Sequence, residues 1–339
     1  MGKLQVIVGG QYGSEAKGAV TGYLARSERN LLAIRVGGPN AGHTVYDENG
    51  TRWPLRQVPV AAVTNPNAHL VVGPGSEVDL PVLREEVAGL GVGSRLWIDA
   101  QATLMSAADK IAGEAQLNRG IGSTGKGVST SRANRIMRKA TLAHEIFPLS
   151  ALTDTALVAR RHLEMGHTVQ VEGTQGYALG LHAGWYPHCT SGDCRAIDML
   201  SQAGVTPWDE FVDDLEVWVV FRTYPIRVAG PSGPMYGETS WGELGLAPEY
   251  TTVTQKMRRV GDWDFDLARK AIDANGGANR VHVALMMFDY WYPEIEGMTD
   301  IEALDVVQWE RLWSIAGEIG ADVELIGTGP RTLIDLRKS

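Results

Sequence analysis

Short apolar runs alternate with segments of helical periodicity along this chain, and glycine-rich turns follow many of the apolar runs. The apolar runs predict strands over residues 6–8, 31–36, 69–75, 95–99, 168–173, 216–224, 280–287 and 321–326. The periodic segments predict helices over residues 19–25, 80–90, 102–117, 149–165, 265–274 and 301–319. This alternation indicates an α/β protein whose mainly parallel central sheet is flanked by helices, with ligands at the carboxyl ends of the strands.

The first glycine-rich turn, residues 9–18, joins the first predicted strand to the first predicted helix and reads Gly-Gly-Gln-Tyr-Gly-Ser-Glu-Ala-Lys-Gly. A strand, a glycine-rich turn and a helix together present backbone N–H groups to phosphate oxygens, and Lys17 adds a positive charge at the helix start. The turn is not a Walker A sequence, because Lys17 follows Ala16 and precedes Gly18. The alternative is a turn that only lets the helix pack closely on the strand.

A second glycine-rich turn, residues 37–44, ends the next predicted strand and carries His43. A histidine exposed on such a turn is suited to proton transfer beside a phosphate, whereas we expect structural roles for the other seven histidines. A third glycine-rich segment, residues 120–127, precedes several basic residues, and a polar basic loop spans residues 250–261. These anion-binding features suit an enzyme that handles two phosphorylated ligands and a carboxylate, with phosphoryl transfer supported by Lys17, backbone N–H groups and a metal.

The chain has 339 residues and a net charge of −9, with 44% apolar and 21% charged residues. Because neither a repeat nor a domain boundary is evident, we expect a single domain over residues 1–339, with helical and loop insertions around the sheet. The negative charge argues against a general nucleic-acid or membrane surface. No apolar run approaches transmembrane length, no signal peptide is evident and two cysteines cannot form a disulfide framework, so we expect a soluble cytoplasmic protein.

Residues 10–18 and 37–44 resemble the two signature sequences of the adenylosuccinate synthetases. Further matching blocks follow in family order at residues 122–127, 172–176, 190–191, 227–228, 252–259 and 327–330, so the resemblance covers essentially the whole chain. The compact length resembles the short archaeal and phage members. The resemblance implies a P-loop-NTPase-like adenylosuccinate synthetase fold and a Mg²⁺-dependent ligase that joins aspartate to carbon 6 of a purine monophosphate. In that family the 6-oxygen is first phosphorylated by a nucleoside triphosphate and then displaced.

The resemblance also implies a role for each matching position. It makes His43, Lys17, Gln175 and Ser14 the catalytic positions: His43 as the acid, Lys17 neutralising phosphate and Gln175 holding the 6-oxo edge. It places the nucleoside triphosphate at Gly13, Glu15, Ala16, Lys17, Gly18, Gly42, His43, Thr44, Asp289, Gly327, Gly329 and Pro330. It places the purine monophosphate at Ser14, Asn40, Ser123, Thr124, Arg138, Gln175, Thr190 and Val228. It places L-aspartate at Thr252, Val253, Thr254, Arg258 and Arg259. Mg²⁺ falls at Gly42 and Ser14, and the protein is expected to be a homodimer in which Arg138 reaches the partner's nucleotide.

Ser14 departs from the family pattern, which has an aspartate at this position. That aspartate takes the proton from ring nitrogen 1 of inosinate and binds the metal, whereas serine has neither a suitable pKa nor a carboxylate. An aspartate would also crowd a purine 2-amino group, for which serine leaves space and a hydroxyl acceptor. This pattern resembles the phage branch of the family, whose purine substrate is dGMP and whose product is the 2-aminoadenine precursor.

Two further departures concern the energy donor and the aspartate loop. Adenylosuccinate synthetases select GTP with an Asn/Thr-Lys-x-Asp motif, but here the stretch reads Met-Met-Phe-Asp, with Met287 at the lysine position and Asp289 retained. The resemblance to the phage branch therefore implies ATP, or dATP, as the donor. Lys256 and Met257 stand where the family prefers arginine and proline, which leaves the carboxylate partners open.

The leading hypothesis is an ATP-dependent ligase acting on dGMP and L-aspartate, in the host cytoplasm if the chain is phage-encoded. One alternative is an adenylosuccinate synthetase of the short archaeal type, using IMP and GTP. An alternative of another class is a catalytically lost relative that binds nucleotide without turnover. A Walker-type ATPase motor is weaker, because the loop lacks Gly-Lys-Ser/Thr.

Overall fold

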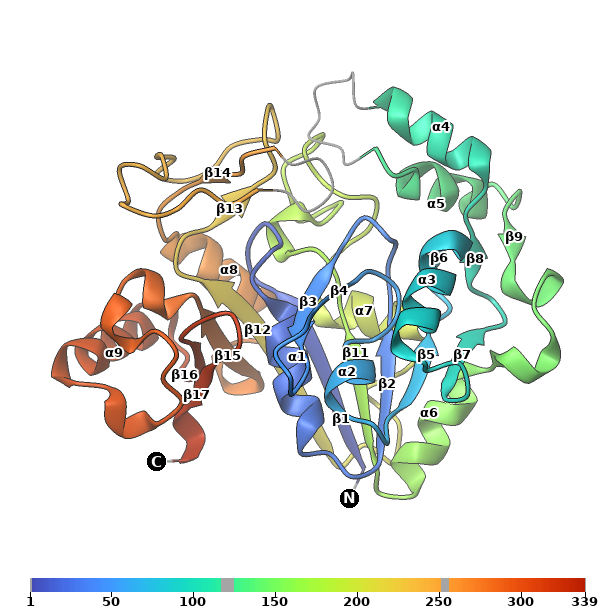
Figure 1. Ribbon diagram of the computed structural model, residues 1–339, viewed down its shortest axis with the longest axis horizontal. Coiled ribbons are helices and arrows are strands. Elements are labelled where there is room, and N and C mark those ends of the chain that lie inside the picture. The colour runs from blue at the N-terminus through green and yellow to red at the C-terminus, as the bar shows by residue number, and fades with distance from the viewer. Residues whose placement is uncertain (1, 117–124, 251–255, 339) are drawn as a thin grey trace.

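The computed structural model describes residues 2–116, 125–250 and 256–338, and within them ten strands form one large sheet (Figure 1). In spatial order these are β10 (Leu152–Thr153), β7 (Leu96–Asp99), β5 (His69–Val72), β2 (Leu31–Arg35), β11 (Thr168–Glu172), β1 (Lys3–Gly9), β12 (Asp214–Arg222), β15 (Val281–Met286), β16 (Val323–Gly327) and β17 (Leu333–Asp335). Each neighbouring pair is parallel except β16 and β17. The predicted mainly parallel sheet is therefore confirmed.

Helices cover both faces of this sheet. The bounds are α1 (Lys17–Arg26), α2 (Ala61–Thr64), α3 (Leu80–Leu90), α4 (Ala107–Gln116), α5 (Val128–Ile136), α6 (Thr155–Glu164), α7 (Ala196–Ala203), α8 (Phe265–Ala274) and α9 (Val306–Ile319). Side chains alternate between the faces along β1: Val6 packs in the core cluster that contains residues of α6, α7, α8 and α9. Ile7 points the other way and packs against α1 through Val20 and Leu24. Buried on both faces, the central strands are apolar runs, as the sequence pattern indicates.

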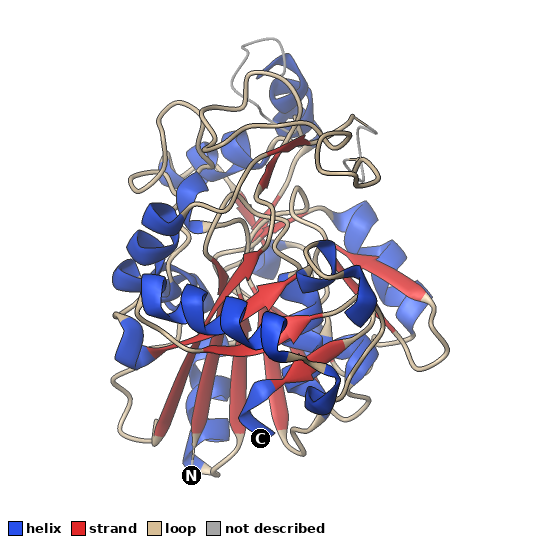
Figure 2. Ribbon diagram, turned by 90° about the vertical axis from the view of Figure 1, so that its left-hand side faces the viewer, coloured by secondary structure: helices blue, strands red, loops and turns tan. Residues whose placement is uncertain are grey.

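Smaller sheets stand beside the large one. They are β3 (His43–Tyr46) with β4 (Arg52–Leu55), β13 (Ile226–Arg227) with β14 (Arg259–Val260), and β6 (Glu77–Val78) with β8 (Thr103–Leu104) and β9 (Thr141–Leu142). Figure 1 shows β13, β14, α4 and α5 above the carboxyl ends of the main strands, and Figure 2 shows loops gathered at that same end. This end of the sheet carries the glycine-rich turns.

The predicted helices over residues 80–90 and 265–274 are confirmed, whereas three others begin later than predicted. Asp154 and Asp305 are N-caps whose carboxylates accept backbone N–H groups, so α6 and α9 begin at Thr155 and Val306. The segment predicted as helix from residue 102 instead begins with strand β8, and α4 starts at Ala107. Among the described residues, no helix combines the length and apolar character needed to span a membrane.

Candidate active site

The turn between β1 and α1 is folded around the buried carboxylate of Glu15. Its Oε1 accepts the backbone N–H of Gln11 at 3.1 Å and that of Gly13 at 2.8 Å. Its Oε2 accepts Lys17 Nζ at 2.8 Å, and Lys17 also donates to the Gln175 carbonyl. With both Glu15 oxygens engaged, this carboxylate orders the loop and joins the lysine to it. The loop thereby has a defined shape, with Lys17 at the start of α1.

Ser14 stands out from this loop, exposed, on a left-handed backbone with φ of 60°. Short polar side chains tolerate this region better than branched ones. Its carbonyl accepts a hydrogen bond from Arg222 Nη1 at 3.2 Å. The backbone of Ser14 is thus held in place while its side chain is exposed.

His43 lies in a buried ionic cluster at the carboxyl ends of β2 and β11. Its Nδ1 is 2.6 Å from Glu172 Oε1, which also accepts Arg35 Nη1 at 2.6 Å. Glu172 can only accept and Arg35 Nη1 can only donate; Arg35 Nη1 also contacts Nδ1 and lies 3.4 Å from Nε2, so the ring is held between an acceptor and a donor. Burial, and then the Arg35 cation, lower the pKa of His43 to about 3, so the ring is neutral near pH 7.

One pocket brings together three side chains that the sequence assigned to the purine monophosphate, Asn40, Gln175 and Thr190. Gly37 and Gly38 form part of its wall, and a side chain at Gly37 would meet Thr174 at 2.7 Å. Arg132 also lines the pocket; its guanidinium lies 2.6 Å from Glu77. The pocket therefore offers amide, hydroxyl and cationic groups to a phosphorylated ligand.

Asp289 and the turn over residues 327–330 lie at the ends of the neighbouring strands β15 and β16. Among the described residues, Asp289 Oδ1 is buried with no hydrogen-bond partner, and burial raises the pKa of Asp289 to about 6. A buried acceptor without a donor is costly, so this carboxylate is suited to receive N–H groups of a ligand base.

Arg258 and Arg259, the two arginines assigned to aspartate, differ in how many of their N–H donors already have partners. Arg259 donates hydrogen bonds from Nε and Nη2 to the Glu238 carboxylate. Its Nη1 donates to Ser232 Oγ and to the Gly233 carbonyl. Arg258 approaches Glu249 only at 3.7 Å, and its buried Nε has no hydrogen-bond partner within the described residues. Arg258 therefore has more capacity to bind a carboxylate.

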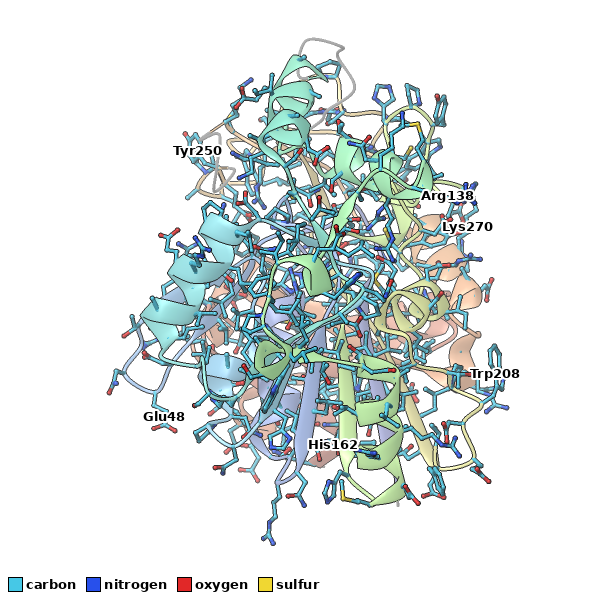
Figure 3. The ribbon with its side chains drawn as sticks, turned by 90° about the vertical axis from the view of Figure 1, so that its right-hand side faces the viewer. Glu48, Arg138, His162, Trp208, Tyr250 and Lys270 are labelled. Carbon is cyan, nitrogen blue, oxygen red and sulfur yellow. The ribbon has the colours of Figure 1, made fainter. Side chains whose placement is uncertain are left out.

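Five of the predicted site residues, Ser123, Thr124, Thr252, Val253 and Thr254, lie outside the described residues. Arg138 is exposed just after α5 (Figure 3) and is not among the residues that line the pocket of Asn40 and Gln175. Val228 follows β13. Gly42 and Pro330 are exposed, Gly329 and Thr44 half-buried and Gly18 buried. The substrate contacts predicted for all of these positions stay predictions.

Several charged residues of the site were not singled out from the sequence. Arg35 and Arg222 are fully enclosed, 1% and 0% exposed, and each ends a strand directly after a run of buried apolar residues. Arg222 pairs with Glu249, whose pKa it holds low against the effect of burial. A charged residue within a buried apolar run was the available signal, because such a residue requires a partner.

This arrangement of strand-end loops has a counterpart in known proteins. The model of the Adenylosuccinate synthetase family matches residues 6–154 and 143–289. The chain therefore belongs to the adenylosuccinate synthetase family, whose members are nucleotide-binding ligases of purine biosynthesis.

Curated adenylosuccinate synthetases of Thermococcus sibiricus and Pyrococcus sp. are each 38% identical, with 98% of both chains covered. A solved structure of cyanophage S-2L succinoaminodeoxyadenylate synthetase (PurZ), bound to dGMP and dATP as an energy donor, is 31% identical with a TM-score of 0.82, covering 98% of this chain and 94% of that one. The fully ligated adenylosuccinate synthetase of Plasmodium falciparum superposes with a TM-score of 0.85 at 18% identity, covering 98% and 100%. The last of these supports the fold alone.

Proposed function

We propose that this protein is a ligase that joins L-aspartate to carbon 6 of dGMP with hydrolysis of ATP, giving N6-succino-2-amino-2'-deoxyadenylate. The observation that carries the proposal is Ser14, an exposed serine on a rigidly held loop where the family has an aspartate. Its small side chain leaves room for the 2-amino group of guanine, and its hydroxyl can accept an N–H from that group. The cyanophage relative, which binds dGMP, supports this choice of purine.

The reaction has two steps that these residues can assist. The γ-phosphoryl group of ATP is transferred to the 6-oxygen of dGMP, the proton of ring nitrogen 1 passes to a phosphate oxygen of a bound nucleotide, and ADP leaves. The aspartate amino group then attacks carbon 6 and displaces phosphate. Lys17 neutralises phosphate charge, and Gln175 holds the 6-oxo edge from the same pocket as Asn40 and Thr190.

His43 acts through its imidazole ring. The neutral ring, held by Glu172 and Arg35, accepts a proton, and beside anionic phosphate groups the protonated ring is favoured. Once protonated it donates to the 6-oxygen and the transferred phosphoryl group. Glu172 and Arg35 orient the ring and do not touch substrate.

Mg²⁺ binds protein through few ligands and completes its shell with water and substrate phosphates. Within the described residues no cluster of three acidic, histidine or cysteine side chains could hold a metal, which agrees with that mode. The Gly42 carbonyl and the Ser14 hydroxyl are both on exposed residues and would hold the ion beside the phosphates. Bound there, Mg²⁺ supplies charge neutralisation on the transferring phosphoryl group.

Asp289 is the residue that would read the base of the triphosphate, through its unpartnered Oδ1. A carboxylate acceptor can take the 6-amino group of adenine, and the relative bound to dATP supports ATP or dATP as donor. We also propose a homodimer in which exposed Arg138 reaches the partner's purine nucleotide.

The deciding experiment is to incubate the purified protein with Mg-ATP, L-aspartate and either dGMP or IMP, and to identify the products by mass spectrometry. We expect the succinylated product from dGMP. Product from IMP but not from dGMP would overturn the proposal. Phosphate release that depends on all three substrates excludes a protein that binds nucleotide without turnover.

An adenylosuccinate synthetase using IMP and GTP is the second candidate. It is favoured by the higher identity to the archaeal enzymes, 38% against 31% for the cyanophage protein, and by the retained Asp289. Against it stands the space that Ser14 leaves for a purine 2-amino group, which IMP lacks. Loss of the proton of ring nitrogen 1 is required for IMP and dGMP alike and does not distinguish them, and Glu15 is not its acceptor, because both Glu15 oxygens are already bonded within the loop.

A further inference from the structure

Strand β12 ends in a buried arginine that contacts two of the loops assigned to substrates. Arg222 is fully enclosed, and its Nη1 donates to the Ser14 carbonyl at 3.2 Å. The same Nη1 donates to Glu249 Oε2 at 3.3 Å, and Nη2 donates to Glu249 Oε1. Two donors that face two carboxylate oxygens form a bidentate pair, which restricts both side chains. Arg222 therefore joins the turn of Ser14 to the residue that precedes the basic loop of residues 250–261.

The side chain of Tyr290 adds a third donor to Glu249. Its hydroxyl donates to Glu249 Oε1 at 3.2 Å, and its ring centroid lies 6.0 Å from Arg222 Cζ. Tyr290 belongs to the turn η6 (Phe288–Tyr290), which also carries Asp289. Both oxygens of Glu249 are thus engaged by Arg222 and Tyr290, which approach from the ends of the neighbouring strands β12 and β15.

Arg258 is fixed beside Glu249 through its backbone but not through its guanidinium. The Arg258 N–H donates to the Glu249 carbonyl at 2.8 Å, and the Arg258 carbonyl accepts the Trp241 indole N–H at 2.8 Å. Arg258 Nη1, however, lies 3.7 Å from Glu249 Oε2, about 1 Å beyond an ordinary N–H···O distance. Burial lowers the pKa of Arg258, and Glu249 opposes this effect only in part. Arg258 is therefore a partly enclosed cation whose neighbouring carboxylate is already bonded to other residues.

We propose that Arg222 is a positioning residue for two substrates: it fixes the turn that carries Ser14, and it keeps Glu249 from pairing with Arg258. The Arg258 guanidinium then stays available for a carboxylate of L-aspartate, so the inference rests on the aspartate role proposed above for Arg258. Without Arg222, Glu249 would need another cation, because a buried carboxylate without a partner is costly. Arg258 is the other cation within 4 Å of it in the described structure. Arg222 itself is fully enclosed and acts only through its neighbours.

The test compares Arg222→Gln with the double variant Arg222→Gln/Glu249→Gln in steady-state assays, with whichever of dGMP or IMP the wild type turns over. In Arg222→Gln we expect the KM for L-aspartate to rise about tenfold, because Glu249 then occupies Arg258. The double variant has no carboxylate to occupy Arg258, so this KM should return to within about threefold of the wild-type value. The KM for the purine monophosphate should stay raised in both variants, because neither restores the contact to the Ser14 carbonyl.

Tyr290→Phe is a milder variant that does not disturb the enclosed guanidinium. It keeps the ring beside Arg222 and removes one hydrogen bond to Glu249, so we expect the KM for L-aspartate to rise about threefold, with less change in the KM for the purine. Arg95→Gln is the matched control. Arg95 donates to three backbone carbonyls and lies next to the amino end of β7, so its loss should lower the melting temperature and leave both KM values unchanged.

Arg258→Gln separates this inference from the proposed function. It should raise the KM for L-aspartate, and an unchanged KM would show that both the aspartate role of Arg258 and the present inference are wrong. If Arg258→Gln raises this KM while Arg222→Gln and Tyr290→Phe leave it unchanged, only the present inference is overturned. Equal KM values for L-aspartate in Arg222→Gln and the double variant would also overturn it, because capture of Arg258 by Glu249 would not then be the cause.

Discussion

At the scale of single residues, Ser14 combines a fixed backbone with a side chain that forms no part of the loop's internal bonding. Its conformation is held by the backbone, through the Arg222 contact to its carbonyl and the Glu15 contacts on either side. No hydrogen bond of its own hydroxyl contributes within the described structure. The side chain at this position can therefore be exchanged without removing a contact that shapes the loop, and our proposal assigns the choice of purine to it.

The first prediction is that Ser14→Asp abolishes most dGMP turnover. The carboxylate would occupy the space of the 2-amino group, and a clash or an unsatisfied polar group costs about 1–3 kcal/mol, equivalent to roughly fivefold to 150-fold in rate. The measurement is kcat/KM for dGMP. Ser14→Ala, which keeps the space, should retain more dGMP activity than Ser14→Asp. Unchanged dGMP turnover in Ser14→Asp would contradict the steric argument.

The second prediction concerns Glu172, which orients His43. In Glu172→Gln, Arg35 loses its anionic partner, and the His43 ring loses the carboxylate that contacts its Nδ1. Removing one partner of a buried ion pair costs about 3–5 kcal/mol of stability. We expect a lower melting temperature and, at temperatures where the variant is folded, a kcat reduced at least about tenfold.

Asp335→Asn separates these two effects. Asp335 is also a buried carboxylate with a paired arginine, Arg337, but it lies on β17 at the edge of the sheet. This variant should lower the melting temperature and leave kcat unchanged. If both variants lowered kcat equally, the effect would be one of general stability and the orienting role of Glu172 would be wrong.

At the scale of elements, the loop between β1 and α1 depends on close approach of the segment after β11. A side chain at Gly176 would lie 2.5 Å from both the Gln11 carbonyl and Glu15 Oε1. The third prediction is therefore that Gly176→Ala displaces the loop and reduces kcat/KM by at least about tenfold. The control is Gly317→Ala in α9, where a side chain meets nothing within 4 Å and should leave kcat/KM unchanged. Full activity of Gly176→Ala would show that the loop tolerates the shift.

Sequence-based predictions were accurate where burial against the sheet imposes a pattern, and inaccurate where a single residue or a short element decides the structure. Apolar periodicity located the central strands and the helices α3 and α8, because burial against the sheet imposes it. Helix starts at α6 and α9 were wrong because the apolar pattern runs on through Asp154 and Asp305. The N-cap residue, and not the apolar pattern, determines where each of these helices begins. Short helices such as α5 and the antiparallel edge strand β17 have too few residues for a clear periodicity.

The residues of the site could likewise be predicted only where a local sequence motif marks them. Motifs placed Asn40, Gln175 and Thr190 in what proved to be one pocket, because the glycine-rich turns that carry them meet at the ends of parallel strands. The partners of the charged residues could not be predicted. Arg222 meets Glu249 from 27 positions along the chain, and such pairing depends on tertiary structure.

At the scale of the whole molecule, the two ends of the sheet have different titrating groups. The catalytic end holds His43 and Asp289. Near the opposite end, where β5 and β11 begin, the His162 ring contacts those of His69 and His167, with centroids 5.3 and 5.4 Å away (Figure 3 labels His162). Burial, and then these neighbouring imidazoles, lower the pKa of His162 from 6.5 to about 4.

The last prediction is that His162 makes the fold sensitive to acid. Between about pH 6.5 and pH 4 the unfolded chain binds a proton at His162 that the folded protein does not, so the free energy of unfolding falls as pH falls, by up to about 1.4 kcal/mol per pH unit. His43, with its pKa lowered to about 3, acts in the same direction, whereas Asp289, with its pKa raised to about 6, acts in the opposite one. Urea unfolding of the wild type and His162→Gln at about pH 7 and about pH 5 isolates the His162 contribution. The wild type should lose more stability on acidification than the variant, and equal losses would contradict a titrating role for this histidine.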